Sequence, residues 1–198
     1  MKLTKYYLIY KPFQVMCQFS PEGEKKTLKD FFQVPNDVYP VGRLDYDSEG
    51  LLLLTNDKAI NNKLLNPTFQ HEREYWVQVD GAIDENAIRL LEKGVDISIN
   101  GKTHHTLPAK AQFLSEKITI PERNPPIRFR KEIPAPWISL TLKEGKNRQV
   151  RKMTAALGFP TLRLVRYRIE KLILDGLQPG EMKELNRAEV CGGLFGRR

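Results

Sequence analysis

Residues 41–57 read VGRLDYDSEGLLLLTND, an acidic loop that leads directly into an uninterrupted apolar run. Leu51–Thr55 has the length of a strand and no polar alternation, so we expect a strand that is buried on both faces. Asn56 or Asp57 then caps a helix that runs to Leu65 and ends at the following Asn-Pro pair. This stretch predicts a loop, a core strand and a helix in immediate succession.

Three acids alternate in the loop: Asp45, Asp47 and Glu49. In an extended chain they point to one side, where like charges repel each other unless a cation balances them. The spacing imitates the start of an EF-hand, but the twelfth position, where calcium needs a bidentate glutamate, is Asn56. A solvated acidic turn is the structural alternative. As a functional site, the loop needs a positive charge nearby.

The rest of the chain alternates strands and helices without a repeat. Strands are expected at 6–10, 72–80, 137–142 and 162–169, with a turn at residues 100–101 between two more strands. A short helix is expected at 27–32. A second helix follows Asp84 and turns Ile88, Leu90 and Leu91 inward, and a third covers 148–157 after an Asn147 cap.

Length and composition fit one globular domain. With 198 residues and 40% hydrophobic content, we expect one domain over residues 1–198, built of two lobes at about 1–68 and 69–198. The first apolar run stops at Lys11-Pro12, too early for a secretory or membrane-spanning segment, so we expect a cytoplasmic protein. Cys17 and Cys191 have no partner at ligand spacing and predict free thiols rather than a metal site or a disulfide.

Positive charge is concentrated in one part of the chain. The formal net charge is +8, but residues 121–171 hold thirteen basic and four acidic residues, a net of +9. Arginine is favoured over lysine there, and guanidinium groups match phosphate oxygens and stack on bases. The proline-rich loop at 121–136 can lie along a nucleic-acid backbone. These features predict a nucleic-acid partner, against the alternative of a merely basic surface.

Three blocks resemble the RsuA-like branch of the pseudouridine synthases. They are residues 42–45 (GRLD) with 48–52 (SEGLL), the strand of Tyr75, and residues 147–153 (NRQVRKM), in the order of the family and spread over about 110 residues. The loop at 121–136 and residues 158–164 (GFPTLRL) look most like the group that acts as large-subunit ribosomal RNA pseudouridine synthase E. Many relatives carry an additional N-terminal S4-type RNA-binding module, which we do not expect here.

The resemblance implies a fold, a reaction and a partner. The fold is α+β, with a mixed, mainly antiparallel sheet, flanking helices and a central cleft. The reaction is the isomerisation of a specific uridine in large-subunit (23S) ribosomal RNA, without a metal or cofactor. We expect a monomer that acts on ribosomal RNA, either naked or in an assembling particle, and not on a membrane.

The resemblance also assigns roles to residues. Asp45 is the catalytic group, acting as a nucleophile on C1′ or on the uracil ring, or as a base at C2′. Arg151 forms an ion pair with it, and Tyr75 stacks on the reacting base, with its hydroxyl as a candidate for removing the C5 proton. Arg43 fills the gap left by the flipped nucleotide. The expected RNA contacts are Arg128, Arg130, Lys146, Arg148 and Lys152, whereas Asp47 and Glu49 shape the loop.

Two rival functions stay open. A noncatalytic ribosomal RNA-binding or assembly factor would use the acidic loop only structurally. A metal-dependent nuclease would use Asp45, Asp47 and Glu49 as ligands.

Overall fold

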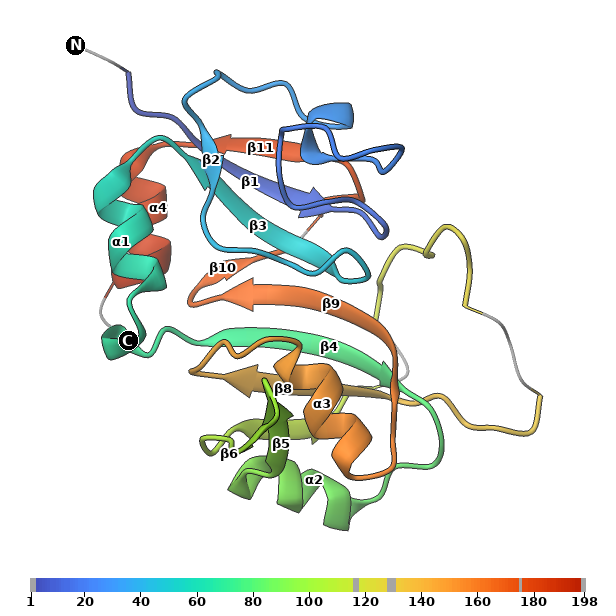
Figure 1. Cartoon of the computed structure of the whole chain (residues 1–198). Helices are drawn as coiled ribbons and strands as arrows, with labels where there is room; N and C mark the ends of the chain where they lie inside the picture. The colour runs from blue at the N-terminus through green and yellow to red at the C-terminus, as the bar shows by residue number, and fades with distance from the viewer. Residues whose placement is uncertain (1–2, 116–117, 128–130, 175, 197–198) are drawn as a thin grey trace. The chain divides into compact units, whose positions relative to one another are not determined.

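The computed structural model describes residues 3–115, 118–127, 131–174 and 176–196 (Figure 1). The chain divides into two compact units, one made of Met1–His71 with Arg166–Arg198 and the other of Glu72–Val165. We expected one boundary near residue 68. The structure places the first change of unit at 71/72 and a second at 165/166, so the C-terminal segment returns to the first unit.

Antiparallel strands form the centre of the first unit. Strand β1 lies between β3 and β11, β2 pairs with β3, and β10 pairs with β9. The strand bounds are β1 Tyr6–Lys11, β2 Tyr39–Pro40, β3 Glu49–Thr55, β9 Thr161–Ile169, β10 Leu172–Ile173 and β11 Met182–Leu185, where only the end of β9 belongs to this unit. Every residue of β1 and β3 is buried, which confirms the expectation of a strand covered on both faces.

Two helices and two 3-10 turns complete this unit. They are α1 Lys58–Leu65, α4 Arg187–Phe195, η1 Leu28–Asp30 and η2 Pro67–Phe69. Of the two expected caps, Asn56 and Asp57, the structure uses Asp57, whose carboxylate accepts from the backbone N–H groups of Ala59 and Ile60. Helices α1 and α4 are in contact, with Lys63 Nζ lying 4.0 Å from the centre of the Phe195 ring.

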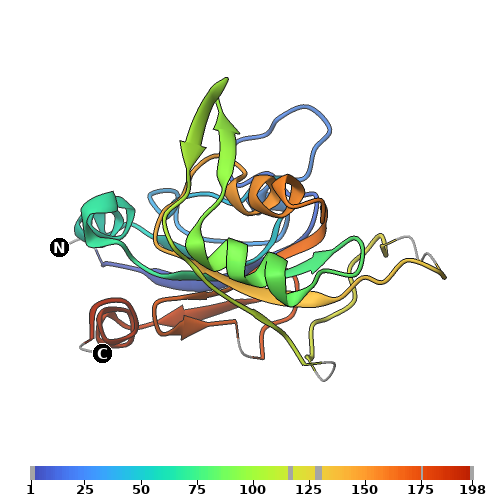
Figure 2. The same ribbon diagram turned by 90° about the horizontal axis from the view of Figure 1, so that it is seen from below.

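The second unit has strands and helices of its own. Strand β8 pairs antiparallel with β4 and β7, and β5 and β6 form a hairpin. The bounds are β4 Arg73–Val79, β5 Asp96–Ile99, β6 Lys102–His105, β7 Lys110–Phe113, β8 Trp137–Leu142, α2 Glu85–Lys93 and α3 Gln149–Ala156. Figure 2 shows α2, α3 and the hairpin on one side of these strands, where their apolar side chains share one core with Val77, Val79 and Leu140.

Three local expectations were wrong in detail. Asn147 is not the cap of α3, because Arg148 takes a left-handed conformation (φ 51°) and becomes the N-cap residue itself. Leu90 is 38% exposed rather than inward. The helix expected at 27–32 is a single 3-10 turn, Leu28–Asp30.

Candidate active site

The acidic loop of the first unit is a tight turn that enters β3. The backbone N–H of Ser48 donates to the carbonyl of Asp45 at 3.0 Å, and the N–H of Gln14 donates to the carbonyl of Tyr46 at 2.9 Å. Asp45 is half-buried, whereas Arg43 is exposed. The backbone of the loop is thus held from inside the unit while the carboxylate of Asp45 keeps partial access to solvent.

A buried lysine lies beneath this loop. Lys11 ends β1, pairs with Gly50 of β3 and is 0% exposed. Its Nζ donates to the carbonyls of Pro12 at 2.9 Å and Val15 at 2.7 Å. Burial lowers the pKa of Lys11 to about 8, and the electrostatic influence of nearby groups opposes that shift: Cys17, Glu49, Asp47 and Asp45.

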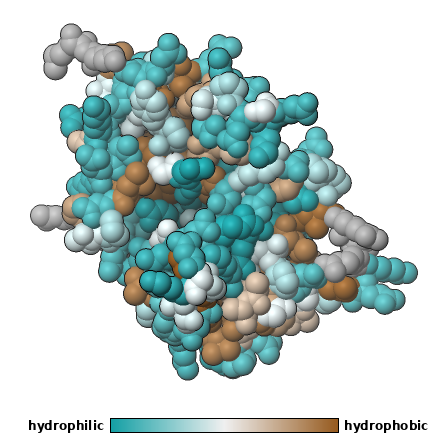
Figure 3. Space-filling view, in the orientation of Figure 1, coloured by the Kyte–Doolittle hydropathy of each residue, from teal (hydrophilic) through white to brown (hydrophobic). Residues whose placement is uncertain are grey.

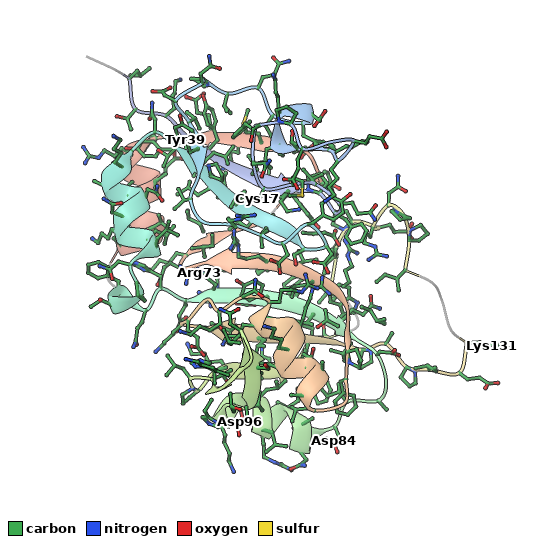
Figure 4. The ribbon with its side chains drawn as sticks, in the orientation of Figure 1. Cys17, Tyr39, Arg73, Asp84, Asp96 and Lys131 are labelled. Carbon is green, nitrogen blue, oxygen red and sulfur yellow. The ribbon has the colours of Figure 1, made fainter. Side chains whose placement is uncertain are left out.

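Lys11 therefore supplies positive charge to the acidic loop from within the same unit. Sequence reasoning missed this lysine, because a lysine at the end of a strand is ordinarily exposed. Cys17, labelled in Figure 4, belongs to the same neighbourhood, and its Sγ lies 3.9 Å from the carbonyl of Gly42. Both cysteines are free, as expected.

Arg166 reaches the other side of the loop from the C-terminal part of the unit. It is 4% exposed, and its Nε donates to the carbonyl of Leu51 at 2.8 Å. Its Nη1 lies 3.5 Å from the carbonyl of Arg43. In the sequence this residue was one of thirteen cations counted toward nucleic-acid binding. Its burial excludes that use, because a phosphate cannot reach a side chain with this exposure.

The second unit carries Tyr75 and Arg151. Tyr75 lies on β4 opposite Leu140 of β8 and packs half-buried against the core of this unit. Arg151 lies on α3, also half-buried, and its Nη1 donates to the carbonyl of Thr161 at 3.3 Å. The hydroxyls of Thr154 and Thr161 lie 2.8 Å apart and tie α3 to the start of β9. The backbone thus fixes the place of both side chains.

A buried polar network shapes the basic loop before α3. Gln149 is 3% exposed, accepts from the N–H of Lys146 at 2.9 Å and donates from its amide to Glu144 at 2.7 Å. The other carboxylate oxygen of Glu144 lies 3.1 Å from Nε2 of His104. Lys146 and Arg148 are exposed and Lys152 is half-buried. Sequence reasoning found these three cations but missed Gln149, which holds the loop that presents them.

The predicted site residues fall into two sets. Arg43, Asp45, Asp47 and Glu49 belong to the first unit with Lys11, and Tyr75, Lys146, Arg148, Arg151 and Lys152 belong to the second. The ion pair of Asp45 with Arg151 joins residues of two units and stays a prediction. Arg128 and Arg130 lie outside the described residues.

Part of the proline-rich loop is fixed by a buried arginine of the second unit. Arg163 is 6% exposed, donates from Nη2 to the carbonyl of Pro121 at 2.8 Å and lies 5.8 Å from the centre of the Trp137 ring. Like Arg166, it serves the fold rather than the surface. The basic surface is therefore smaller than the count of cations indicated.

The described part of the chain lacks both a cluster of metal ligands and a membrane-spanning helix. No group of three or more His, Cys, Asp or Glu residues there is placed to hold a metal ion. None of its helices is long and apolar enough to cross a membrane. The face drawn in Figure 3 is mostly hydrophilic, with hydrophobic residues in separate small patches.

Comparisons with known proteins agree on one family. A family model described as RNA pseudouridylate synthase matches residues 5–156. The chain is 49% identical to ribosomal large subunit pseudouridine synthase E of Vibrio parahaemolyticus over 91% of this chain and 74% of that protein. It is 45% identical to the protein of the same name from Xanthomonas axonopodis pv. citri, over 87% and 89%.

Solved structures give the same result. A crystal structure titled pseudouridylate synthase covers 96% of this chain and 74% of its own, with a TM-score of 0.77 and 28% identity. Human RNA pseudouridylate synthase domain containing 1 matches 93% of this chain with a TM-score of 0.56 and 14% identity, which shows a shared fold. The expected α+β fold with its mixed sheet is confirmed by these likenesses and by the observed strands and helices.

Proposed function

This chain belongs to the RNA pseudouridylate synthase family, and from that premise we propose that it isomerises a specific uridine of large-subunit (23S) ribosomal RNA with Asp45 as the catalytic residue. As a member of the family it is an isomerase that acts on RNA. The ribosomal substrate is inferred from the names of the similar proteins from Vibrio and Xanthomonas. We also propose that it acts in the cytoplasm as a monomer.

The observation that carries the proposal is the setting of Asp45. Its carbonyl is held by Ser48, its side chain is half-buried, and a fully buried ammonium, Lys11, lies in the same unit. A carboxylate that acts as a nucleophile or base must stay deprotonated in a partly dry pocket, and a neighbouring cation favours that form. Arg151 is proposed as the second cation, which forms an ion pair with Asp45.

The reaction is an isomerisation, so uridine and its product have the same atoms. The bond from N1 to C1′ breaks, the bond from C5 to C1′ forms, C5 loses a proton and N1 gains one. Asp45 starts this exchange, and Tyr75 supplies a ring on which the detached uracil stacks while it turns. Such stacking stabilises a bound base by about 1–3 kcal/mol. Arg43, which is exposed and lies two residues before Asp45, is proposed to fill the gap in the RNA when the uridine swings out.

RNA capture is assigned to the exposed cations at the start of α3. Lys146 and Arg148 are held on a loop that the Gln149 and Glu144 network orders, so that little entropy is lost when phosphate binds. Lys152 extends this basic stripe by one helical turn. Arg128 and Arg130 are proposed as further contacts of the proline-rich loop.

The test is product formation by Asp45→Asn. Ribosomal RNA from cells that lack the protein is incubated with the purified enzyme, and pseudouridine is mapped by mass spectrometry and primer extension. We expect the wild type to form it at one position, and Asp45→Asn to form none while it still binds the RNA. Asp47→Asn is the matched control and keeps most of the activity, because Asp47 only shapes the loop.

Three results would contradict the proposal. Undiminished product with Asp45→Asn would exclude the aspartate as the catalytic group. If the wild-type protein binds the RNA but forms no pseudouridine, the noncatalytic binding factor is correct instead. Strand scission that stops in the presence of a chelator would indicate the nuclease.

A further inference from the structure

We infer that Arg166 is a positioning residue for the loop that carries Asp45, because one buried guanidinium holds both ends of that loop. The inference rests on the proposed function, since it assigns the role of the loop to catalysis. It adds a residue that lies more than a hundred positions from Asp45 in the sequence but belongs to the same compact unit.

The contacts of Arg166 bracket the acidic turn. Its Nε donates to the carbonyl of Leu51 at 2.8 Å, just after the turn, and its Nη1 lies 3.5 Å from the carbonyl of Arg43, just before it. The guanidinium is planar and rigid, so it sets the spacing of the two carbonyls. With the contact between Ser48 and Asp45 inside the turn, the backbone of the catalytic aspartate is fixed on three sides.

A glycine lets Arg166 come this close. Gly50 has a φ of +107°, and a Cβ on it would overlap the backbone carbonyl of Arg166. The strand that carries Arg166 therefore lies directly against the residue that ends the acidic turn. Because the two backbones are packed this closely, the position of the Arg166 backbone relative to the loop is fixed, and so is the point from which its guanidinium extends.

Packing alone does not account for an arginine here. Arg166 is 4% exposed, and its Nη2 is buried without a hydrogen-bond partner among the residues that the structure describes. An apolar side chain of the same length would fill the space without desolvating a charge or leaving that donor unsatisfied. What the apolar side chain would lack is the pair of donors that holds Arg43 and Leu51.

Misplacement of a catalytic group by about 1 Å can lower a rate by about a hundredfold. We expect Arg166→Met, which keeps the length of the side chain, to lower kcat by ~100-fold and to change KM for the RNA by less than ~2-fold. Arg166→Lys keeps the charge but reaches only one of the two carbonyls, so its kcat is expected to fall by ~10-fold.

Hydrogen exchange gives a readout that does not depend on activity. In Arg166→Met we expect amides of residues 42–50 to exchange at least ~10-fold faster, with smaller changes in β1, α1 and α4. Arg163→Met is the matched control, because it also removes a buried arginine that donates to a carbonyl, at Pro121. It should lower the melting temperature without a selective change in residues 42–50.

The outcomes separate the two proposals. If the wild type forms no pseudouridine, the proposed function fails, and the exchange experiment still decides whether Arg166 holds the loop. If the wild type is active but Arg166→Met keeps its kcat, or exchange rises uniformly over the first unit, the positioning role is wrong. Should Arg166→Met not fold, Arg166→Lys carries both measurements, and wild-type kcat with wild-type exchange in that variant overturns the inference.

Discussion

At the residue scale, Lys11 has the most unusual environment of the charged groups described above. It is fully buried at the end of β1, and its ammonium donates to two carbonyls of the turn that follows. Burial lowers its pKa to about 8 from an ordinary value of 10.5, and the acids of the loop recover part of that loss. The ammonium form of Lys11 is thus costly to the fold.

This cost predicts a pH dependence of stability with a definite sign. Below pH 8 both folded and unfolded states hold the Lys11 proton, so the full penalty is present. Between pH 8 and pH 10.5 the unfolded state holds more protons, and stability rises with pH. Relative to Lys11→Met, we expect the free energy of unfolding of the wild type to increase by about 3 kcal/mol across this window.

Urea unfolding of both proteins over this pH range measures that difference. Ionisation of Tyr6, whose pKa burial raises to about 12, acts equally in both and cancels. Lys29→Met changes an exposed lysine and should leave the slope as in the wild type. A constant difference between wild type and Lys11→Met would show that Lys11 keeps an ordinary pKa.

Substitutions of Tyr75 separate the contribution of its hydroxyl to product formation from that of its ring. Its ring packs on the core of the second unit, so Tyr75→Phe keeps the stacking surface. If stacking is its whole role, Tyr75→Phe keeps product formation within ~10-fold of the wild type, and Tyr75→Leu loses the stacking energy of about 1–3 kcal/mol. Single-turnover rates with the RNA substrate measure both. Complete loss of product in Tyr75→Phe alone would assign proton removal from C5 to the hydroxyl.

At the scale of the element, helix α1 depends on one carboxylate with two duties. Oδ1 of Asp57 accepts from the N–H groups of Ala59 and Ile60, and Oδ2 accepts from the hydroxyl of Tyr6 at 2.7 Å. The same side chain therefore caps α1 and ties it to β1. The sequence indicated the cap, because aspartate before a helix is a local signal, but the bond to β1 depends on tertiary contact.

Asp57→Ala removes both interactions. We expect the free energy of unfolding to fall by about 2 kcal/mol, about 1 kcal/mol from the cap and about 1 kcal/mol from the tyrosine bond. Asp57→Asn retains an acceptor for the cap and should lose less, and Tyr6→Phe should lose only the second share. Thermal or urea unfolding measures all three, and equal losses in Asp57→Ala and Tyr6→Phe would contradict the capping role.

At the scale of the whole molecule, the proposed active site draws on two compact units. Asp45 comes from the first and Arg151 from the second, which the chain enters after His71 and leaves after Val165. Each unit has its own core and holds its own functional side chains in place. The ion pair of Asp45 with Arg151 therefore stays a prediction, which a substitution can test.

Arg151→Ala tests that pairing. We expect product formation to fall by at least ~100-fold, because Asp45 loses the cation that favours its charged form, while the circular dichroism spectrum stays native. Lys152→Ala is the neighbouring control and should weaken RNA binding without such a loss of rate.

In a double-mutant cycle of unfolding free energies, Asp45→Asn and Arg151→Ala should show a coupling of about 1 kcal/mol or more. Strict additivity, or near-normal turnover in Arg151→Ala, would refute the pair.

Sequence alone was sufficient where the physical signal is local. The apolar run at 51–55 predicted a doubly buried strand, Asp57 predicted a cap, and residues 100–101 predicted a hairpin turn, all of which the structure contains. The motifs around Asp45, Tyr75 and Arg151 indicated the family. Such short patterns can be identified in a sequence without knowledge of how the segments between them fold.

Tertiary structure decided which charges are inside. Lys11 and Arg166 look like surface cations in a sequence, yet each becomes buried because other segments of the chain cover it and supply carbonyl acceptors. The left-handed turn at Arg148 and the close approach at Gly50 likewise depend on what lies beside them. Burial and backbone contact between distant segments are properties of the folded chain, so local patterns identified the proposed catalytic residues but not the groups that hold them.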